Sequence, residues 1–373
     1  MSILSKANMR VTLEVDTAKI RHNIKKVCEL IAPSKLIAVV KANAYGLGAI
    51  EVSQICKEAG ADSLGVADLN EALELRRMGL PIMILGSLLP GEISDAIKND
   101  IILPVNDFKG AQKISTEAVK QNKSVQCQIL VDSGMGRLGL LLENAHQKIK
   151  KIIKLANLEF IGIYSHFPIA DNTENDYTNK QIKSFKSLLK ALESDGIFFN
   201  NIHTANSDGI NNYSEACQKP FNRVRMGLNI YGFSNPELLG LKTVVSFKAK
   251  LALKRKLPAK SFIGYGKTHC LEKDTLIGTI AAGYADGLPL ALSNCGHVLI
   301  HGHKCPIIGR ISMDYITVDL SQVPKAKCGD EVVCIGEQNG EAIPLQAWVE
   351  IKKTHAHDIL CGITSRAKRI YIK

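Results

Sequence analysis

The sequence of 373 residues has few aromatic side chains and no long apolar run: Phe, Trp and Tyr together make up 5%, and Trp occurs once. A helix that crosses a bilayer needs about 20 consecutive apolar residues, and no segment of the sequence approaches this length. The first ten residues, MSILSKANMR, lack the continuous apolar segment of a secretory signal. We therefore expect a cytoplasmic protein with no membrane partner.

The ten cysteines include no Cys-x-x-Cys pair. A chain of this length does not need a disulfide framework, so we expect reduced thiols. Histidines gather in residues 297–303, ahead of Cys305, and again in residues 355–357. Because glycine favours tight turns, the stretch from His301 to His303 fits a hairpin tip better than a pair of ligands. We therefore predict no metal site.

The charges are unbalanced, since 47 Lys and Arg face 36 Asp and Glu, which gives a formal net charge of +11. A basic surface can attract nucleic acid. The basic runs at 148–154 and 253–257 are short, however, and they lack the interleaved aromatic residues that single-strand binding uses. We therefore predict no nucleic-acid partner, although a few of these cations are available to an anionic small molecule.

Short apolar runs alternate with helix-like segments from residue 35 to about residue 232. Each run is apolar on both faces, as a parallel strand covered by helices is. The eight runs are KLIAVVKA (35–42), SLGVAD (63–68), PIMILGS (81–87), IILPVN (101–106), SVQCQILVD (124–132), LEFIGIYSHF (158–167), FNNIHTAN (199–206) and FNRVRMGLNIYG (221–232).

The segments between these runs show the 3.6-residue periodicity of amphipathic helices. Residues 50–60 and 69–79 end in Gly, which is a helix stop signal, and residues 144–156 and 179–194 repeat the pattern. Eight β/α units in about 200 residues favour a (β/α)8 barrel of the TIM type. An open doubly wound sheet is the alternative.

The pattern changes after about residue 241. Apolar runs there are separated by Gly, Pro and Asp turns, with no helical segments between them. We therefore predict an α/β protein in which a barrel (residues 1–240) precedes a mostly antiparallel β domain (residues 241–373).

Function in such a barrel sits at the C-terminal ends of the strands. The predicted ends carry a dense polar set: Lys41, Asn43 and Tyr45, then Asp132 and Arg137, then His166, then His203, Asn206 and Ser207, and finally Arg223, Arg225 and Gly227.

Lys41 is the most informative of these residues, because it follows the apolar run LIAVV. A lysine whose stem starts inside the barrel has a lowered pKa, and its amine can then form a Schiff base with an aldehyde. If the strand ends at Val40, Lys41 lies in solvent instead. The position of Lys41 in the sequence does not decide between a buried and a solvent-exposed amine.

Two further motifs admit structural explanations. The glycines of VDSGMGRLG match a dinucleotide fingerprint, but no convincing acidic strand end follows about 20 residues on, so we expect them to shape a loop that turns Arg137 inward. Tyr265, between two glycines in FIGYGKT, acts as an acid or base only if a partner lowers its pKa from about 10.

Taken together, the motifs are similar to those of the alanine racemases. AVVKANAYGLG resembles the cofactor-lysine segment of that family, VVKANAYGHG. The following segments match in order: DSGMGRLG, the segment around His166, ANSDG, VRMGLNIYG, GYGKT, AAGYADG, GRISMD and the terminal CGITSR. The matches cover nearly the whole chain, and the family's barrel and C-terminal β domain agree with the fold predicted above.

The resemblance implies a pyridoxal 5'-phosphate enzyme in which Lys41 binds the cofactor covalently. It implies that Arg225, oriented by His203, faces the pyridine nitrogen and keeps it unprotonated, which makes the cofactor a weaker electron sink. The remaining residues that it assigns to the cofactor are Tyr45, Asn206, Ser207, Gly227, Leu228 and His357.

The same resemblance implies one base on each face of the substrate's α-carbon. Lys41 takes the proton of the D-amino acid, and Tyr265, supplied by the other subunit of a homodimer and lying beside His166, takes that of the L-amino acid. Arg137 and the backbone of Met313 hold the substrate carboxylate. Family members place the residues matching Asp171, Tyr284 and Arg310 along the access channel.

Three positions depart from the family pattern. Leu130 replaces a lysine that is often carbamylated and supports the substrate-binding arginine, so Arg137 lacks that partner. His357 replaces a tyrosine, which leaves a preference for serine over alanine open. Leu47 replaces a histidine, to which we assign no consequence.

The sequence therefore predicts an alanine racemase whose D-alanine serves peptidoglycan synthesis. The alternatives are a racemase of broader or serine preference, a fold-related amino-acid decarboxylase, and a non-catalytic cofactor-binding protein. The decarboxylases lack the GYADG and SMD segments, and the non-catalytic relatives lack the β domain.

Overall fold

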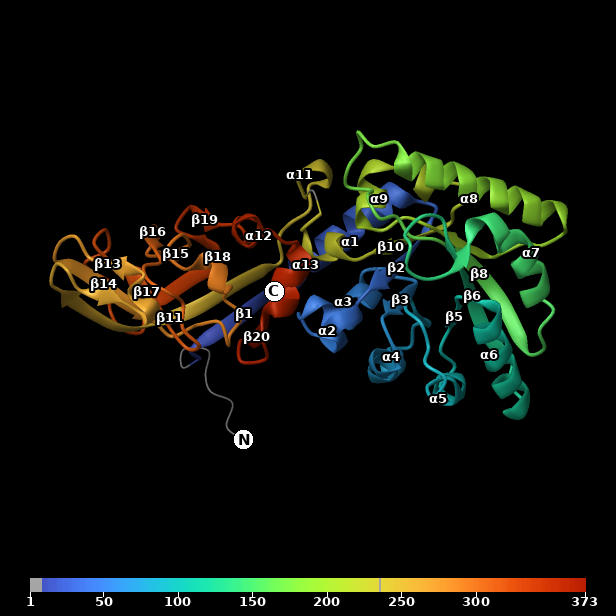
Figure 1. Ribbon diagram of the computed structural model, residues 1–373, viewed down its shortest axis with the longest axis horizontal. Coiled ribbons are helices and arrows are strands. Elements are labelled where there is room, and N and C mark those ends of the chain that lie inside the picture. The colour runs from blue at the N-terminus through green and yellow to red at the C-terminus, as the bar shows by residue number, and fades with distance from the viewer. Residues whose placement is uncertain (1–8, 235) are drawn as a thin grey trace. The chain divides into compact units, whose positions relative to one another are not determined.

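The computed structural model describes residues 9–234 and 236–373, which form two units (Figure 1). The barrel unit comprises Lys19–Ala44 and Gly48–Thr243. The β unit comprises the described residues up to Ala18, together with Tyr45–Leu47 and Val244–Lys373. Residues 1–8, on which most of the signal-segment prediction rests, lie outside the described residues.

The barrel unit contains eight parallel strands within the described part of the chain. They are β2 (Lys35–Val39), β3 (Ser63–Val66), β4 (Ile82–Ile84), β5 (Leu103–Val105), β6 (Val125–Asp132), β8 (Leu158–Tyr164), β9 (Asn201–His203) and β10 (Arg223–Met226). Ladders join β10-β2-β3-β4 and β5-β6-β8-β9. A parallel bridge from Met83 to Ile102 links β4 to β5, and the hydrogen bond from Asn222 N to Ile202 O (3.0 Å) links β9 to β10. The barrel is therefore closed, and the open-sheet alternative is wrong.

Helices alternate with these strands, and in Figure 1 helices α4 to α8 surround them. The helices and the short strand of this part of the chain are α1 (Thr17–Ile31), α2 (Lys41–Tyr45), α3 (Ala49–Glu58), α4 (Leu69–Leu75), α5 (Ile93–Lys98), α6 (Phe108–Lys120), β7 (Leu140–Leu141), α7 (Leu142–Ile152), α8 (Tyr177–Ser194), α9 (Ser207–Asn212), α10 (Leu228–Tyr231) and α11 (Pro236–Leu239). The predicted helices correspond to α3, α4, α7 and α8.

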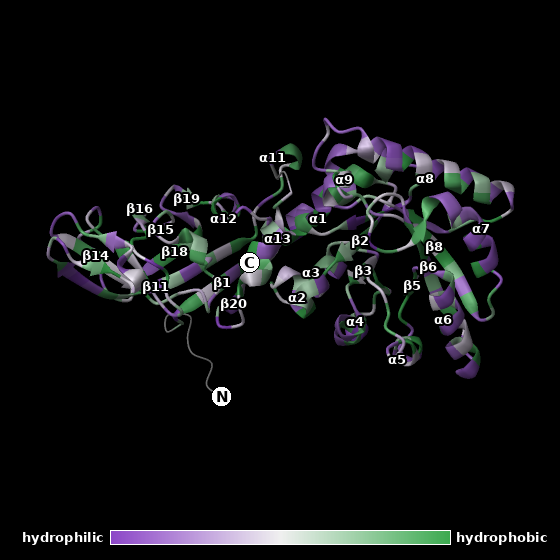
Figure 2. Ribbon diagram, viewed as in Figure 1, coloured by the Kyte–Doolittle hydropathy of each residue, from purple (hydrophilic) through white to green (hydrophobic). Residues whose placement is uncertain are grey.

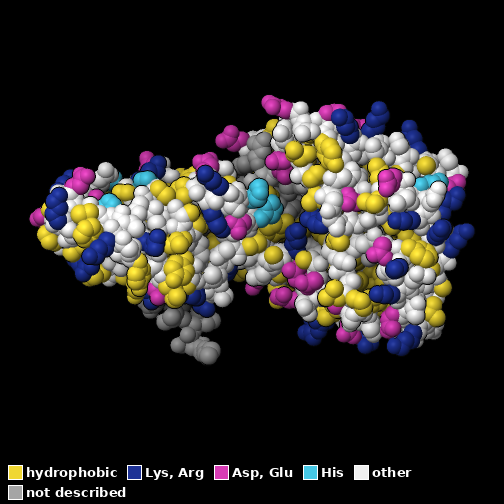
Figure 3. Space-filling model, in the orientation of Figure 1, with side chains coloured by type: hydrophobic (Ala, Val, Ile, Leu, Met, Phe, Trp, Pro, Cys, Tyr) yellow, Lys and Arg dark blue, Asp and Glu magenta, His cyan; other side chains and the backbone are white. Residues whose placement is uncertain are grey.

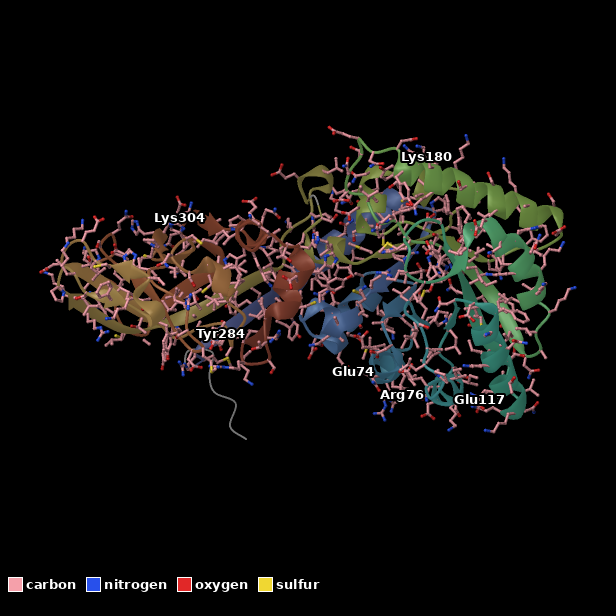
Figure 4. The ribbon with its side chains drawn as sticks, in the orientation of Figure 1. Glu74, Arg76, Glu117, Lys180, Tyr284 and Lys304 are labelled. Carbon is pink, nitrogen blue, oxygen red and sulfur yellow. The ribbon has the colours of Figure 1, made fainter. Side chains whose placement is uncertain are left out.

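The helices are amphipathic, which explains why they cover the barrel. Side chains such as Ile149 and Phe185 are buried against the strands, and Figure 2 shows hydrophilic and hydrophobic residues interspersed along α7 and α8. In Figure 4, Glu74, Arg76 and Lys180 point away from the strands into solvent. The interior is filled by a cluster that includes Ile37, Met83, Ile102, Leu130 and Tyr164.

The β unit is a nine-stranded sheet with the order β16-β15-β18-β11-β1-β20, to which β14, β17 and β19 are added. Its elements are β1 (Val11–Asp16), β11 (Val245–Leu257), β12 (Phe262–Ile263), β13 (His269–Cys270), β14 (Thr275–Ile280), β15 (His297–Ile300), β16 (His303–Pro306), β17 (Ile316–Asp319), β18 (Glu331–Gln338), β19 (Glu341–Ile343), α12 (Leu345–Lys352), α13 (Ala356–Gly362) and β20 (Lys368–Ile372). Most of its pairs are antiparallel, as expected, and a turn at His301 and Gly302 joins β15 to β16.

Two features of the β unit differ from the prediction. Strand β1 pairs antiparallel with β11 and parallel with β20, so the start of the chain belongs to the β unit rather than to the barrel. Helices α12 and α13 follow β19, where the sequence reading contained no helix. Both are short, and their buried side chains, among them Leu345 and Trp348, give only one turn of apolar spacing.

The contribution of β1 can be measured at Leu13. Leu13 is fully buried and lies opposite Phe247, whose ring packs edge-on against Trp348 at 6.0 Å. We expect Leu13→Ala to lower the free energy of unfolding of the β unit by about 3 kcal/mol, because it leaves a cavity. Urea unfolding followed by Trp348 fluorescence reports this unit. The exposed Leu253 provides the control, Leu253→Ala, and a loss below about 1 kcal/mol at Leu13 would contradict the assignment of β1.

Candidate functional site

A cavity of about 280 Å³ lies in the barrel unit at the C-terminal ends of the strands. Lys41 follows β2, Arg137 follows β6, His166 follows β8, and Arg225 is part of β10. All four line this cavity. The barrel therefore brings together four side chains that the sequence analysis selected from separate segments.

Lys41 begins a left-handed turn. Ala42, Asn43 and Ala44 have φ angles between 51° and 54°, and Tyr45 has φ 57°. This conformation costs about 1–2 kcal/mol for each residue with a Cβ atom. The turn ends β2 before Lys41, whose side chain is half-buried and lines the cavity. The lysine thus lies neither in the barrel core nor in bulk solvent.

Glu71 stabilises this turn, and the sequence analysis did not identify it. Its Oε1 accepts the Ala42 N–H at 2.7 Å, and its Oε2 accepts the Ala67 N–H at 2.8 Å. Glu71 therefore joins the ends of β2 and β3, and it offsets part of the cost of the left-handed turn that presents Lys41. Nothing local in the sequence links Glu71 to a backbone amide 29 residues away.

Arg225 is only 4% exposed, and its two terminal nitrogens are held by the barrel backbone and by two histidines. Nη2 donates to Ser165 O at 2.7 Å and to Thr204 O at 2.9 Å, and it lies 3.2 Å from His166 Nδ1. Nη1 contacts His203 Nδ1. Burial lowers the pKa of Arg225 to about 10, so the guanidinium is still charged at neutral pH.

His203 is fully buried beneath Arg225 and is not among the residues that line the cavity. Burial, followed by the charges of Arg225 and Arg223, holds its pKa well below the ordinary value, so the ring is neutral. His203 therefore contacts Arg225 and not the cavity itself.

His166 differs from His203 in reaching the cavity. Burial and the nearby Arg225, Arg137 and Lys41 lower its pKa to about 3. A neutral imidazole beside three cations can accept a hydrogen bond without adding further positive charge.

Tyr164 is a second residue that the sequence analysis missed. Its ring stacks on His203 with centroids 4.9 Å apart, and the Arg225 guanidinium lies over the same ring at 5.5 Å. Its hydroxyl is buried without a hydrogen-bond partner among the described residues, although the side chain lines the cavity. Burial raises its pKa to about 12, so the hydroxyl remains a donor.

The glycine loop after β6 wraps around the carboxylate of Asp132. Asp132 Oδ1 accepts N–H groups from Gly134, Met135 and Gly136 at 2.8–3.1 Å, and Oδ2 accepts that of Arg137 at 3.2 Å. Partial burial raises the pKa of Asp132, but these four donors outweigh it and lower the pKa below its ordinary value.

The Arg137 side chain reaches the cavity, and no ion pair of Arg137 is found in the described part of the chain. Leu130 belongs to the apolar cluster inside the barrel. The Leu130 side chain therefore offers Arg137 no hydrogen bond.

Ser207 lies at the start of α9 and connects to the next strand. Its Oγ accepts the Gly227 N–H at 3.1 Å and the Asn229 N–H at 3.2 Å, which leaves its own proton for an acceptor. Leu228 begins α10 and is buried. Asn206 uses its Oδ1 to cap α9 through the Gly209 N–H at 2.9 Å.

Two predicted residues meet within the β unit. The rings of Tyr45 and His357 lie 5.4 Å apart at 35°, and burial raises the pKa of the Tyr45 hydroxyl. Leu47, the third departure from the family pattern, is fully buried.

The remaining predicted residues of the β unit are exposed on loops: Tyr265 is 72% exposed, Met313 52% and Tyr284 44%. The loops of Tyr284 and Met313 are joined, because Tyr284 N–H donates to Ser312 O at 3.0 Å. Figure 4 labels Tyr284 on this unit. Arg310 is also exposed, and so is Asp171 on the barrel unit.

Three features of the described residues concern other classes of site. No group of three or more His, Cys, Asp or Glu side chains in this part of the chain is arranged to hold a metal ion. No helix found there is long and apolar enough to cross a membrane. Lys and Arg side chains are dispersed among Asp and Glu over the face shown in Figure 3.

Comparison with known proteins gives consistent results over both units. Residues 15–235 match the family model "Alanine racemase, N-terminal domain", and residues 244–371 match "Alanine racemase, C-terminal domain". The chain is 39% identical over 368 residues to an alanine racemase of Methanococcus maripaludis, which covers 96% of this chain and 98% of that protein.

Solved structures agree with this result. An alanine racemase of Bacillus anthracis with bound L-Ala-P superimposes with a TM-score of 0.91 at 32% identity, covering 100% of this chain and 96% of that one. An alanine racemase of Bartonella henselae with covalently bound pyridoxal phosphate superimposes with a TM-score of 0.88 at 32% identity, covering 97% and 99%.

The lowered pKa of His166 predicts a loss of stability in acid. An unfolded histidine takes up a proton below about pH 6.5, which the folded His166 does not. Between pH 7.5 and 5.5 the free energy of unfolding should therefore fall by about 1.4 kcal/mol on account of this residue. His166→Asn should remove that part of the pH dependence in urea unfolding followed by circular dichroism, with the exposed His303→Asn as control. If the pH dependence of His166→Asn equals that of the wild type, the pKa of His166 is not lowered in the folded protein.

Proposed function

Because the chain belongs to the alanine racemase family, we propose that it interconverts L-alanine and D-alanine with pyridoxal 5'-phosphate as cofactor. The observation that carries this proposal is the cavity in which Lys41, His166, Arg137 and Arg225 meet at the C-terminal end of the barrel. A lysine amine in a cavity rich in cations suits an aldehyde that carries a phosphate group.

The described residues fit this cofactor. The buried Tyr164 hydroxyl has no hydrogen-bond partner among them. The hydrogen bonds of Arg225 to the described residues come from its two terminal nitrogens, so its Nε–H is available to the cofactor. The Ser207 proton is available to a phosphate oxygen. When bound, pyridoxal phosphate withdraws electrons from the substrate and so makes its α-hydrogen acidic.

We assign the holding residues as follows. Lys41 binds the cofactor covalently, and Arg225, positioned by His203, faces the ring nitrogen. Residues that hold the phosphate are Ser207, the backbone of Gly227 and Leu228, and Tyr45, with His357 beside Tyr45 and Asn206 keeping the Ser207 turn in place. The support for Asn206 and His203 is indirect, since both contact other residues of the site.

The two bases lie on different units of the chain. Lys41 Nζ takes the α-proton of D-alanine, and Tyr265 Oη takes that of L-alanine, with the neutral His166 beside the tyrosine. When one residue removes the α-proton from its face, the other residue, in its protonated form, donates a proton to the opposite face, so the two exchange roles with the direction of the reaction.

We assign Tyr265 to the cavity of a partner subunit in a homodimer. Among the large hydrophobic side chains described on the β unit, Tyr265 is the most exposed, and Phe262, Met313 and Leu290 are each more than half exposed in the single chain. Exposed apolar groups of this size are typical of protein interfaces. Tyr284 and Arg310 of the partner, and Asp171 of the barrel, would then border the access channel.

The substrate carboxylate is assigned to Arg137 and to the backbone N–H of Met313. The backbone N–H of Arg137 is held by Asp132, whereas Leu130 offers its guanidinium no polar partner. We therefore infer that Arg137 is less rigidly held than a lysine-supported arginine. The choice between alanine and serine depends on the pocket around His357, and a substrate panel separated by chiral chromatography tests it.

Three further assignments complete the proposal. The sites divide between the barrel unit, which holds the cofactor lysine, and the β unit, which holds the second base. The cytoplasm is the expected compartment, which is supported by the absence of disulfides among the ten cysteines, all of them in the described ranges. Use of the D-alanine in peptidoglycan synthesis follows from the resemblance alone.

Lys41→Ala should abolish covalent attachment of pyridoxal phosphate and racemisation together, because the amine is both anchor and base. Absorbance of the bound cofactor and chiral analysis of alanine give the two readouts. Lys35→Ala, at an exposed lysine on the same strand β2, is the control. A Lys41→Ala protein that keeps the covalent absorbance would refute the assignment.

Tyr265→Phe should leave the cofactor absorbance unchanged and slow proton removal from L-alanine by about a hundredfold, with a smaller effect on D-alanine. Exchange of the α-hydrogen with deuterated water, measured separately from each enantiomer, separates the two directions. Tyr315→Phe, another exposed tyrosine on the β unit, is the control. Equal slowing from both enantiomers would contradict the separate bases.

A further inference from the structure

Gln128 lies on β6 inside the barrel, only 3% exposed, and connects to the buried arginine of the site. Its Oε1 lies 2.8 Å from His203 Nε2. Its Nε2 lies 3.8 Å from the sulfur of Met83.

The partners of His203 determine which ring nitrogen carries the proton. A guanidinium has only donors, so His203 Nδ1, which contacts Arg225 Nη1, has to be the acceptor. The neutral ring therefore carries its proton on Nε2, and that N–H points at Gln128.

Gln128 is oriented to receive this proton. Only the amide oxygen can accept it, and the amide nitrogen then faces the Met83 sulfur, a weak acceptor. The hydrogen bonds thus run in one direction, from Arg225 to His203 and from His203 to Gln128, and all three side chains are buried.

Removal of the Gln128 amide oxygen would loosen the hold of His203 on the Arg225 guanidinium. With no partner for Nε2–H, that buried donor is left unsatisfied, which disfavours the present tautomer. The other tautomer places an N–H at Nδ1, directly against the N–H groups of Arg225. Either way, the contact that fixes Nη1 is weakened, while Ser165 and Thr204 still hold Nη2.

We propose that Gln128 is a positioning residue of racemisation, whose amide oxygen keeps the His203 proton on Nε2 and thereby fixes Arg225 in the cavity. This inference rests on the proposed function in one respect, namely that Arg225 faces the ring nitrogen of the cofactor. Gln128 touches neither cofactor nor substrate, and it acts through His203 and Arg225.

The test begins with the cofactor-free protein labelled with ¹⁵N-histidine. Long-range proton–nitrogen spectra distinguish Nε2–H from Nδ1–H, and His203→Asn identifies the signal. We expect His203 to carry its proton on Nε2 in the wild type and in Gln128→Glu, which keeps an acceptor. Gln128→Met, which has a similar shape and no acceptor oxygen, should lose that signal or shift it. The control is Gln126→Met, at the exposed glutamine two residues earlier on the same strand.

The second measurement uses the holoenzyme. Gln128→Met should lower kcat for alanine about tenfold while KM changes less than about twofold, because Arg225 is not assigned to the substrate. Gln128→Glu should recover most of kcat, and Gln126→Met should equal the wild type. This pattern separates a hydrogen bond from simple packing.

Three results would overturn the proposal: a wild-type His203 protonated on Nδ1, a Gln128→Met protein with the wild-type signal and kcat, or a Gln128→Glu protein that keeps the Nε2 proton but is no more active than Gln128→Met. If the wild type binds no pyridoxal phosphate and racemises nothing, the proposed function fails instead. The spectra of the cofactor-free protein then still decide the arrangement of Gln128, His203 and Arg225.

Discussion

The site depends on one buried cation, the guanidinium of Arg225. A charge in a barrel interior is expensive unless it is fully solvated by the protein. Here Ser165 O, Thr204 O, a neutral His203 and the face of Tyr164 replace water around it. These groups come from the ends of β8 and β9, and Arg225 lies on the next strand of the barrel, β10. The position of Arg225 is therefore a consequence of the order in which these three strands lie side by side.

The charge of Arg225 also determines the chemistry around it. It helps to keep His166 and His203 neutral, and with Lys41 and Arg137 it makes the cavity positive. Asp132 is the carboxylate among the described residues that line the cavity, and its two oxygens accept hydrogen bonds from four backbone N–H groups. The cavity is thus suited to a phosphate and a carboxylate, whereas the net charge of +11 is spread over the surface and contributes little.

Much of this could be predicted from the sequence, for identifiable reasons. Parallel strands buried on both faces give short apolar runs, so all eight barrel strands were found, and Lys41, Arg137, His166 and Arg225 stood at their ends. Strand β1 was missed because its partners, β11 and β20, lie more than 200 residues away along the chain. Glu71, Tyr164 and Gln128 were missed for a related reason, since each acts through a contact between different strands or loops. The resemblance indicated that Leu130 cannot support Arg137. The sequence could not show what Leu130 packs against, because its apolar neighbours come from other strands.

The central claim is that a charged Arg225 faces the ring nitrogen of the bound cofactor. The most direct test is the ¹⁵N chemical shift of that ring nitrogen in protein reconstituted with ¹⁵N-labelled pyridoxal phosphate. A guanidinium of pKa about 10 remains the proton carrier at neutral pH, so the account predicts the shift of an unprotonated pyridine that accepts a hydrogen bond. The shift of a protonated pyridinium at pH 7 would contradict it.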